Sequence, residues 1–259
     1  CPVSIISVNP ATGEVVREYP VIEPAECLAI LEKTHQAFQE WRILSVAERL
    51  APFYALAELL EGGLENHAAL ITRENGKPIR ESRQEIQDSA DLARYVADHA
   101  REYLQGQALP SRWSSSHLEN QPLGIILGIM PWNFPFLQPL RVALTGMAAG
   151  NGFLLKPASS TPDCALTLEA LLRQAGFSEN LFRTLLTNSE NLSFALVHPA
   201  VQGVAFTGST EIGKTVAAQA ASQLKQCQLE LGGSDPAIVL EDADLDQAVE
   251  GILRGKLIH

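Results

Sequence analysis

The sequence contains few of the residues that mark several common protein classes. Only four cysteines occur in 259 residues, at positions 1, 27, 164 and 227, with no CxxC pair and no neighbouring histidine. A zinc site, any other metal site and a disulfide framework are therefore not expected. Scattered cysteines of this kind are typical of proteins in the reducing cytoplasm, which is the expected location.

Basic residues are also in the minority. The 19 lysines and arginines face 30 acidic residues, which gives a formal net charge of -11 and no basic cluster. Binding to nucleic acid would need a basic surface, so no nucleic-acid partner is expected.

Long apolar runs are absent as well. No run approaches the ~18 apolar residues that a membrane-spanning helix needs. The start, Cys1 to Ser4, has neither the basic nor the apolar stretch of a signal peptide. Because it also lacks a methionine, we expect the chain to be trimmed at the front. The remaining composition, 46% hydrophobic and 19% charged, is that of a soluble globular protein without a membrane segment.

Residues 1–105 have the pattern of a mostly helical section. Apolar residues recur at helical spacing over 24–41 and 45–61, after the helix-start signals Glu23-Pro24 and Ser45. The segment Glu74-Asn75-Gly76-Lys77-Pro78 interrupts this pattern, and a charged helix is expected from about residue 80. Its alternating charges are typical of a solvated helix face.

Residues 106–122 are polar and rich in turn formers, with Pro110 and three consecutive serines at 114–116. This composition fits a flexible linker, and it equally fits a polar hairpin that reaches another subunit. The sequence leaves both interpretations open.

Residues 123–259 alternate between strand and helix patterns. This alternation predicts a Rossmann-like α/β fold, with a mostly parallel sheet covered by helices on both faces. Ligands of such sheets bind beyond the carboxyl ends of the strands. The expected strands are 124–130, 152–156, 181–186, 201–206, 227–231 and 237–240, and the expected helices are 136–149, 162–175, a short one near 192, 210–224 and 245–254.

Gly208 to Thr215 matches the phosphate-binding pattern GxxxxGK[ST] between an expected strand and an expected helix. With Asp242 as a magnesium-binding acid, it would indicate a nucleotide triphosphatase. A phosphate-cradling loop, however, needs small residues throughout. Thr210, Glu211 and Ile212 instead favour the first turn of a helix that is capped by Ser209 or Thr210.

The turn Met130-Pro131-Trp132-Asn133-Phe134-Pro135 follows an expected strand. Two prolines restrict its backbone and hold Asn133 at the strand end. A rigid amide in this place could donate to an oxyanion, which requires preorganised donors. A structural turn with a capping asparagine is the alternative.

Leu229-Glu230-Leu231-Gly232-Gly233 places one carboxylate at an apolar strand end. Burial would raise the pKa of such a carboxyl group and make Glu230 a candidate general base. The alternative is a strand-end acid that faces solvent. Gly232 and Gly233 would permit a ligand to approach the backbone closely.

Taken together and in order, these motifs resemble the aldehyde dehydrogenase superfamily. The resemblance rests on Pro131-Trp132-Asn133-Phe134-Pro135, Leu155-Lys156-Pro157-Ala158, Phe206-Thr207-Gly208-Ser209-Thr210 and Glu230-Leu231-Gly232-Gly233. The segments Asn9-Pro10-Ala11-Thr12-Gly13-Glu14 and Glu74-Asn75-Gly76-Lys77-Pro78 also resemble the family, so that the likeness extends over essentially the whole chain.

This resemblance implies roles for individual residues. Asn133 would donate its amide to a thiohemiacetal oxyanion, and Glu230 would activate water as the general base. Lys156 would hydrogen-bond the adenosine ribose of NAD or NADP, and Ser209 with Gly208 would bind the pyrophosphate at a helix N-terminus. The further cofactor-contacting residues would be Met130, Pro131, Trp132, Phe206, Thr207, Ile212, Leu231 and Gly232.

Ser159 bears on the choice of cofactor. Many NAD-preferring family members have a glutamate three residues after the lysine, whereas this chain has a serine. A serine removes the negative charge that would repel a 2′-phosphate, and Lys156 lies nearby. Both NAD and NADP therefore remain possible.

Arg141 lies in the expected helix after the Asn133 turn, where semialdehyde-oxidising relatives often have an arginine. Its guanidinium could pair with a substrate carboxylate, or it could form a structural ion pair. The run from Glu230 to Pro236 also resembles bacterial succinate-semialdehyde dehydrogenases. Succinic semialdehyde is therefore the expected small-molecule substrate.

The family resemblance also implies a subunit arm over 106–122, and hence a homodimer or homotetramer. The nucleophilic cysteine of the family is expected beyond residue 259, in a catalytic domain that is absent from this chain. Residues 1–259 alone are accordingly expected to bind the cofactor without turning over aldehyde. A stand-alone nucleotide-binding domain is a further hypothesis, and it would bind NAD or NADP without any aldehyde chemistry.

Overall fold

The N-terminal section is mostly helical, as predicted. The computed structural model describes residues 4–188 and 192–257. The hairpin of β1 and β2, which the sequence pattern did not predict, precedes the helices. The elements are β1 (Ser4–Val8), β2 (Val15–Pro20), α1 (Pro24–Trp41), α2 (Val46–Gly62), α3 (Leu64–Asn75) and α4 (Ile79–Tyr103).

Local signals set the ends of these helices. Pro24 begins α1, where its missing N–H removes no helical hydrogen bond. Ser45 and Glu48 form a capping box at the start of α2, in which each side chain accepts from the other residue's backbone N–H. Gly76 ends α3 with a φ of 79°, a conformation that glycine adopts without steric strain.

Strands and helices alternate through the rest of the chain and form a parallel five-stranded sheet in the order β7-β6-β5-β8-β9. The predicted Rossmann-like fold is confirmed. The elements are β5 (Ile125–Ile129), α5 (Leu137–Ala148), β6 (Gly152–Lys156), α6 (Pro162–Ala175), β7 (Phe182–Thr184), α7 (Ser193–Val197), β8 (Val201–Gly208), α8 (Thr210–Ser222), β9 (Gln226–Leu231) and α9 (Leu245–Leu257).

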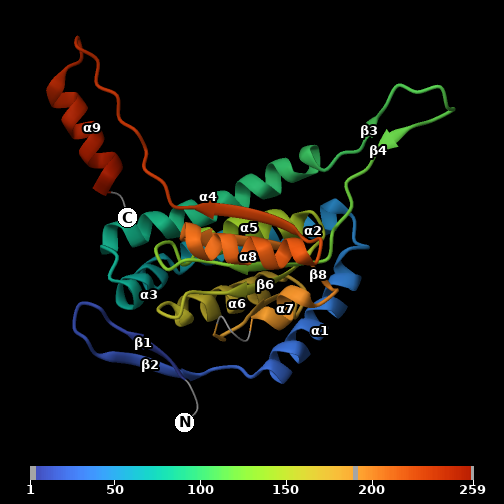
Figure 1. Cartoon of the computed structure of the whole chain (residues 1–259), viewed down its shortest axis with the longest axis horizontal. Helices are drawn as coiled ribbons and strands as arrows, with labels where there is room; N and C mark the ends of the chain where they lie inside the picture. The colour runs from blue at the N-terminus through green and yellow to red at the C-terminus, as the bar shows by residue number, and fades with distance from the viewer. Residues whose placement is uncertain (1–3, 189–191, 258–259) are drawn as a thin grey trace.

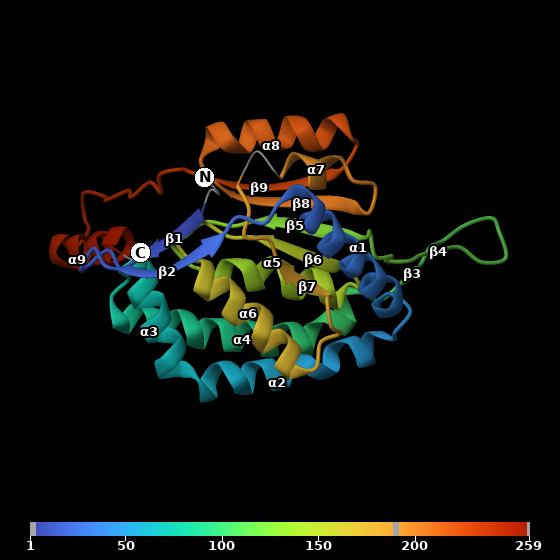
Figure 2. The same ribbon diagram turned by 90° about the horizontal axis from the view of Figure 1, so that it is seen from below.

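Helices cover both faces of the sheet, as Figure 2 shows. On one face, α2, α4, α5 and α6 pack into a core that includes Phe153 and Leu155 of β6. On the other face, α1, α7 and α8 pack around Leu154, which lies between Phe153 and Leu155 in β6. Adjacent residues of a strand point to opposite faces, so the continuous apolar run of β6 serves both cores.

Residues 106–122 form a polar hairpin, and its contact with another subunit stays a prediction. Gln107 pairs with Leu118 and Ala108 with His117 in the antiparallel strands β3 (Gln107–Ala108) and β4 (His117–Leu118). The hairpin projects away from the sheet and its helices in both views (Figures 1 and 2).

The expected strand at 237–240 is wrong. These residues form neither strand nor helix, and Ile238, Val239 and Leu240 are exposed. An apolar run becomes a strand only when its backbone finds a hydrogen-bonding neighbour. Among the described residues, none pairs with this segment, which leads away from the sheet to α9 (Figure 1).

None of the helices in the described part of the chain is both long enough and apolar enough to cross a membrane.

Candidate functional site

The strand order creates a switch point between β5 and β8. From β5 the chain proceeds to β6 and β7 on one side, and it then returns to place β8 on the other side of β5. The segments that leave the carboxyl ends of β5 and β8 therefore lead into helices on opposite faces of the sheet. Such a divergence opens a crevice at the sheet edge, which is where ligands of this fold bind.

The register of the sheet aligns the predicted site residues along this edge. Ile129, the last residue of β5, pairs with Lys156 of β6 on one side and Phe206 of β8 on the other. Thr207 of β8 pairs in turn with Glu230 of β9. Segments that are distant in sequence thus meet at one edge, where the backbone N–H of Met130 donates to the carbonyl of Lys156 at 3.1 Å.

The predicted residues differ in their accessibility. Met130 and Phe206 are each buried in one of the two cores, so their side chains support the edge from within these cores. Half-buried at the edge are Pro131, Asn133, Lys156, Thr207 and Gly208, and exposed around it are Trp132, Ser159, Ser209, Ile212, Glu230, Leu231 and Gly232.

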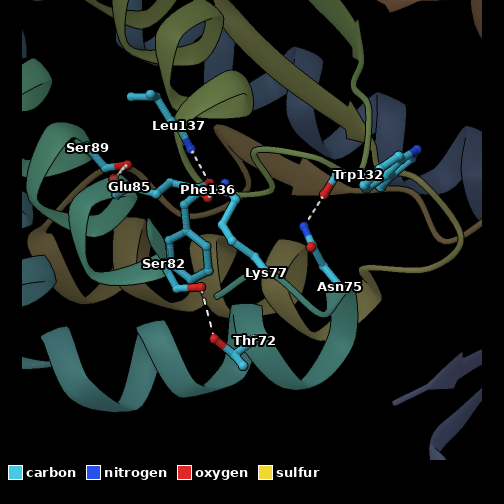
Figure 3. A network of polar contacts seen from close by, with 9 residues as sticks. All are labelled: Thr72, Asn75, Lys77, Ser82, Glu85, Ser89, Trp132, Phe136 and Leu137. Atoms are coloured by element: carbon cyan, nitrogen blue, oxygen red, sulfur yellow. Dashed lines mark hydrogen bonds and ion pairs between the residues drawn. The ribbon is translucent and has the colours of Figure 1, made fainter. Parts of the chain in front are cut away.

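Two of the helices that leave this edge have N-termini already occupied by buried carboxylates. Glu85 of α4 accepts hydrogen bonds from the backbone N–H groups of Phe136 and Leu137 at the start of α5, at 2.8 and 3.2 Å (Figure 3). Glu74 of α3 does the same for α6, where it accepts from the N–H groups of Asp163 and Cys164. Neither helix N-terminus is available to a ligand.

The N-terminus of α8 remains accessible. Ser209 is the N-cap, its hydroxyl accepts from the N–H of Ile212 at 3.5 Å, and the residues of this first turn are exposed. Free N–H groups and the helix dipole make such an end a binding site for anions. Of the helices that follow β5, β6 and β8 in the described chain, α8 is the one that can receive a phosphate group here.

The same geometry does not support the triphosphatase hypothesis. The helix already begins at Thr210, so Gly213 is buried inside it and Lys214 lies in its second turn. The ammonium group of Lys214 is exposed and 3.5 Å from the carboxylate of Glu211. A phosphate-cradling loop would need this segment to be non-helical, with its N–H groups turned inward.

Lys156 combines a strand-end position with partial burial. Burial lowers the pKa of its ammonium group below the usual lysine value of 10.5. Ser159 is exposed three residues later, in the segment between β6 and α6. A cation beside a small uncharged side chain can accept an anionic ligand without repulsion.

Asn133 lies in the turn between β5 and α5, directly at the switch point. The neighbouring carbonyl of Trp132 accepts a hydrogen bond from the side-chain amide of Asn75 at 2.7 Å (Figure 3). Glu230 is on β9, two strands along the edge from β5. Its side chain is exposed in this chain, as in the alternative of a strand-end acid that faces solvent.

Arg141 lies about one turn into α5 with an exposed side chain. It is accessible to a ligand, but its position on the helix sets it apart from the aligned strand ends.

The thiols that the structure describes are either buried or distant from the strand ends at this edge. Cys27 and Cys164 are buried, and exposed Cys227 pairs with Val204, well before the end of β9. Within residues 4–188 and 192–257, no cluster of three or more histidine, cysteine or acidic side chains could hold a metal ion.

Sequence reasoning missed the residues that support the Asn133 turn from the helical section, namely Asn75, Lys77 and Glu85. Glu85 and Lys77 are fully buried and form an ion pair at 2.7 Å. One signal could have identified Glu85: it stands among small and apolar residues, Ser82, Ile86 and Ser89, on the buried face of α4.

Comparisons with known proteins place the chain in a family. A model of the aldehyde dehydrogenase family matches residues 3–259. A succinate-semialdehyde dehydrogenase [NADP(+)] of Deinococcus radiodurans is 39% identical over 251 residues, which are 97% of this chain and 53% of that protein. A probable succinate-semialdehyde dehydrogenase [NADP(+)] of Synechocystis is 42% identical over 95% of this chain and 54% of its own length.

Solved structures show the same fold. Succinic semialdehyde dehydrogenase from Streptococcus pyogenes, in complex with NADP+ as the cofactor, superposes with a TM-score of 0.94 at 32% identity, over 98% of this chain and 56% of its own. The chain spans about half the length of the relatives it matches. Because the family model matches nearly every residue, the chain belongs to the aldehyde dehydrogenase family.

Proposed function

We propose that the complete protein oxidises succinic semialdehyde to succinate with NADP or NAD. The observation that carries this proposal is the alignment of Asn133, Lys156 and Glu230 along one sheet edge beside the open N-terminus of α8. The names of the related succinate-semialdehyde dehydrogenases support the choice of substrate, and the NADP+ complex supports the choice of cofactor.

The residues at the edge fit a dinucleotide. The α8 N-terminus offers free N–H groups to a pyrophosphate, and Lys156 can donate to a ribose or a 2′-phosphate. Ser159 adds no negative charge near that phosphate. When bound, the nicotinamide accepts the hydride that leaves the substrate carbon.

Asn133 and Glu230 have separate roles in the proposed mechanism. A cysteine thiolate outside residues 1–259 attacks the aldehyde carbon, and the Asn133 amide donates to the oxygen as it becomes negative. Loss of hydride leaves a thioester on the cysteine. Glu230 then removes a proton from the water that hydrolyses this thioester and releases the carboxylate. Glu230 is exposed here, so the remaining part of the enzyme would supply its apolar surroundings.

Arg141 is proposed to bind the carboxylate of the substrate. Its guanidinium is exposed and can form two parallel hydrogen bonds with a carboxylate. The hairpin over 106–122 is proposed to pair with a neighbouring subunit of a homodimer or homotetramer, because it projects from the body (Figure 1).

The proposal is tested by measuring reduction of NADP and NAD by the complete protein with succinic semialdehyde and with butyraldehyde, which lacks the carboxylate. We expect turnover of succinic semialdehyde, and an Arg141→Met variant that loses the preference over butyraldehyde. Cofactor binding without turnover of any aldehyde would instead favour a stand-alone nucleotide-binding domain. Magnesium-dependent ATP hydrolysis would favour the triphosphatase.

Two lysines provide a matched test of the cofactor site. Lys156→Met is expected to weaken NADP binding about 10-fold or more, because hydrogen bonds to charged groups contribute about 1.5–3 kcal/mol. Lys214→Met should leave the affinity within about twofold, since Lys214 is exposed and pairs with Glu211. Isothermal titration calorimetry of both variants measures the difference. A larger loss at Lys214 than at Lys156 would contradict the proposed site.

The pH dependence of the same binding gives a second readout. Because burial lowers the pKa of Lys156, its positive charge is lost on raising the pH before the usual value of 10.5 is reached. NADP affinity of the unmodified protein should therefore begin to fall below that pH. The alkaline decrease should be absent from Lys156→Met.

A further inference from the structure

A buried ion pair lies directly behind the Asn133 turn. Lys77, in the segment between α3 and α4, places its ammonium group 2.7 Å from the carboxylate of Glu85, and both side chains are at most 1% exposed. Two charges removed from water are costly, and their mutual attraction often only balances that cost. The other contacts of Lys77 and Glu85 therefore indicate which function the pair has.

Glu85 anchors the end of the turn. Its Oε1 atom accepts from the N–H groups of both Phe136 and Leu137, while Oε2 accepts from Lys77 (Figure 3). The residue at the N-cap of α5 is Phe136, which has no side-chain acceptor of its own. The first amide groups of α5 thus depend on a carboxylate that is 51 residues away in the sequence.

Lys77 and Asn75 hold the rest of the turn. The ammonium group of Lys77 lies 3.6 Å from the centre of the Phe134 ring, and Asn75 donates to the carbonyl of Trp132 at 2.7 Å. Asn133 lies between Trp132 and Phe134 in the sequence. The turn is consequently contacted on both sides of Asn133 from the junction of α3 and α4.

We propose that Lys77 and Glu85 are positioning residues, which fix the orientation of the Asn133 amide toward the reacting oxygen. This inference rests on the proposed function, because it assumes that Asn133 is the oxyanion donor. An oxyanion donor acts only if it is already aimed at the developing charge, and a displacement of about 1 Å can reduce the rate about 100-fold. The ion pair supplies that rigidity, because displacing either side chain would leave the other charge buried without a counter-charge.

The test compares two double variants of the complete enzyme. Lys77→Met/Glu85→Gln keeps one acceptor oxygen for the N–H groups of Phe136 and Leu137, and Lys77→Met/Glu85→Met removes it. Neither variant leaves an unpaired buried charge, so that both are expected to fold. The two variants differ in the hydrogen-bond acceptor at position 85, while the glutamine and methionine side chains there are closely matched in volume.

Steady-state kinetics separates positioning from general damage. We expect kcat of the Met/Met variant to fall about 10-fold or more below that of the Met/Gln variant, with KM and NADP affinity within about twofold. In an Asn133→Ala background the same comparison should show less than about a twofold difference, because the group being positioned is gone. Equal kcat values for the Met/Met and Met/Gln variants would overturn the proposal. An equally large difference in kcat between them in the Asn133→Ala background would also overturn it.

Amide hydrogen exchange provides a readout that does not depend on catalysis. The peptide that contains Phe136 and Leu137 should exchange faster in the Met/Met variant than in the Met/Gln variant, whereas Arg83→Gln, which breaks an exposed ion pair of α4, should not change it. Unchanged exchange would refute the positioning role. An inactive unmodified enzyme with the expected exchange difference would instead refute the proposed function.

Discussion

Asn133→Ala is expected to lower kcat of the complete enzyme about 100- to 1,000-fold, the usual effect of removing one oxyanion donor. Asn133 lies at the switch point directly after the central strand β5, and the turn is contacted on both sides of it. The substituted side chain contributes in the transition state, so KM for the aldehyde and affinity for NADP should change little.

The control for this prediction is Gln39→Ala, which removes an exposed amide from α1, away from the site. It should retain the full kcat. Pre-steady-state measurement of NADPH formation would show whether the loss in Asn133→Ala lies in the oxidation step. A variant with normal kcat would exclude Asn133 from the mechanism and leave it as a structural turn residue.

The second large effect concerns stability. Glu85→Met alone is expected to destabilise the fold by about 3–5 kcal/mol, because it leaves the ammonium of Lys77 buried without a counter-charge. Lys77→Met/Glu85→Met should recover part of this loss, because it leaves no unpaired buried charge. The remainder, about 1–3 kcal/mol, corresponds to the unsatisfied N–H groups of Phe136 and Leu137.

Urea unfolding at neutral pH measures both variants against the unmodified protein. Arg83→Met serves as the control, since its ion pair with Glu65 is largely exposed and should contribute less than about 1 kcal/mol. If the single variant were as stable as the double variant, Lys77 would have to find another partner or reach water, and the ion pair would not constrain the turn.

Local patterns were sufficient to predict most of the fold. The capping box at Ser45 and the cap at Ser209 involve residues three apart, so that the sequence alone places the starts of α2 and α8. The alternation of apolar strands with helical periods predicted a parallel sheet. It follows from this topology that the motifs at Asn133, Lys156, Phe206 and Glu230 meet at one edge.

Contacts between distant segments were not predictable in this way. The caps that Glu74 and Glu85 provide for α6 and α5 join the helical section to the sheet section, and no local pattern relates their positions. The apolar run at 237–240 led to the opposite error, because a strand was predicted there and does not form. It has the composition of a strand, but strand formation depends on a partner that sequence periodicity does not specify.

The strand order also determines when the crevice can form during folding. β5 pairs with β6, which follows it closely in the chain, but its other neighbour, β8, is synthesised only after α6, β7 and α7. Because closing a longer loop costs more conformational entropy, the β5–β8 seam is expected to close later than β5–β6. The switch point lies at this late seam. A nucleotide bound there would stabilise the last contacts of the sheet to form, and the cofactor would thus also act as a ligand that completes folding.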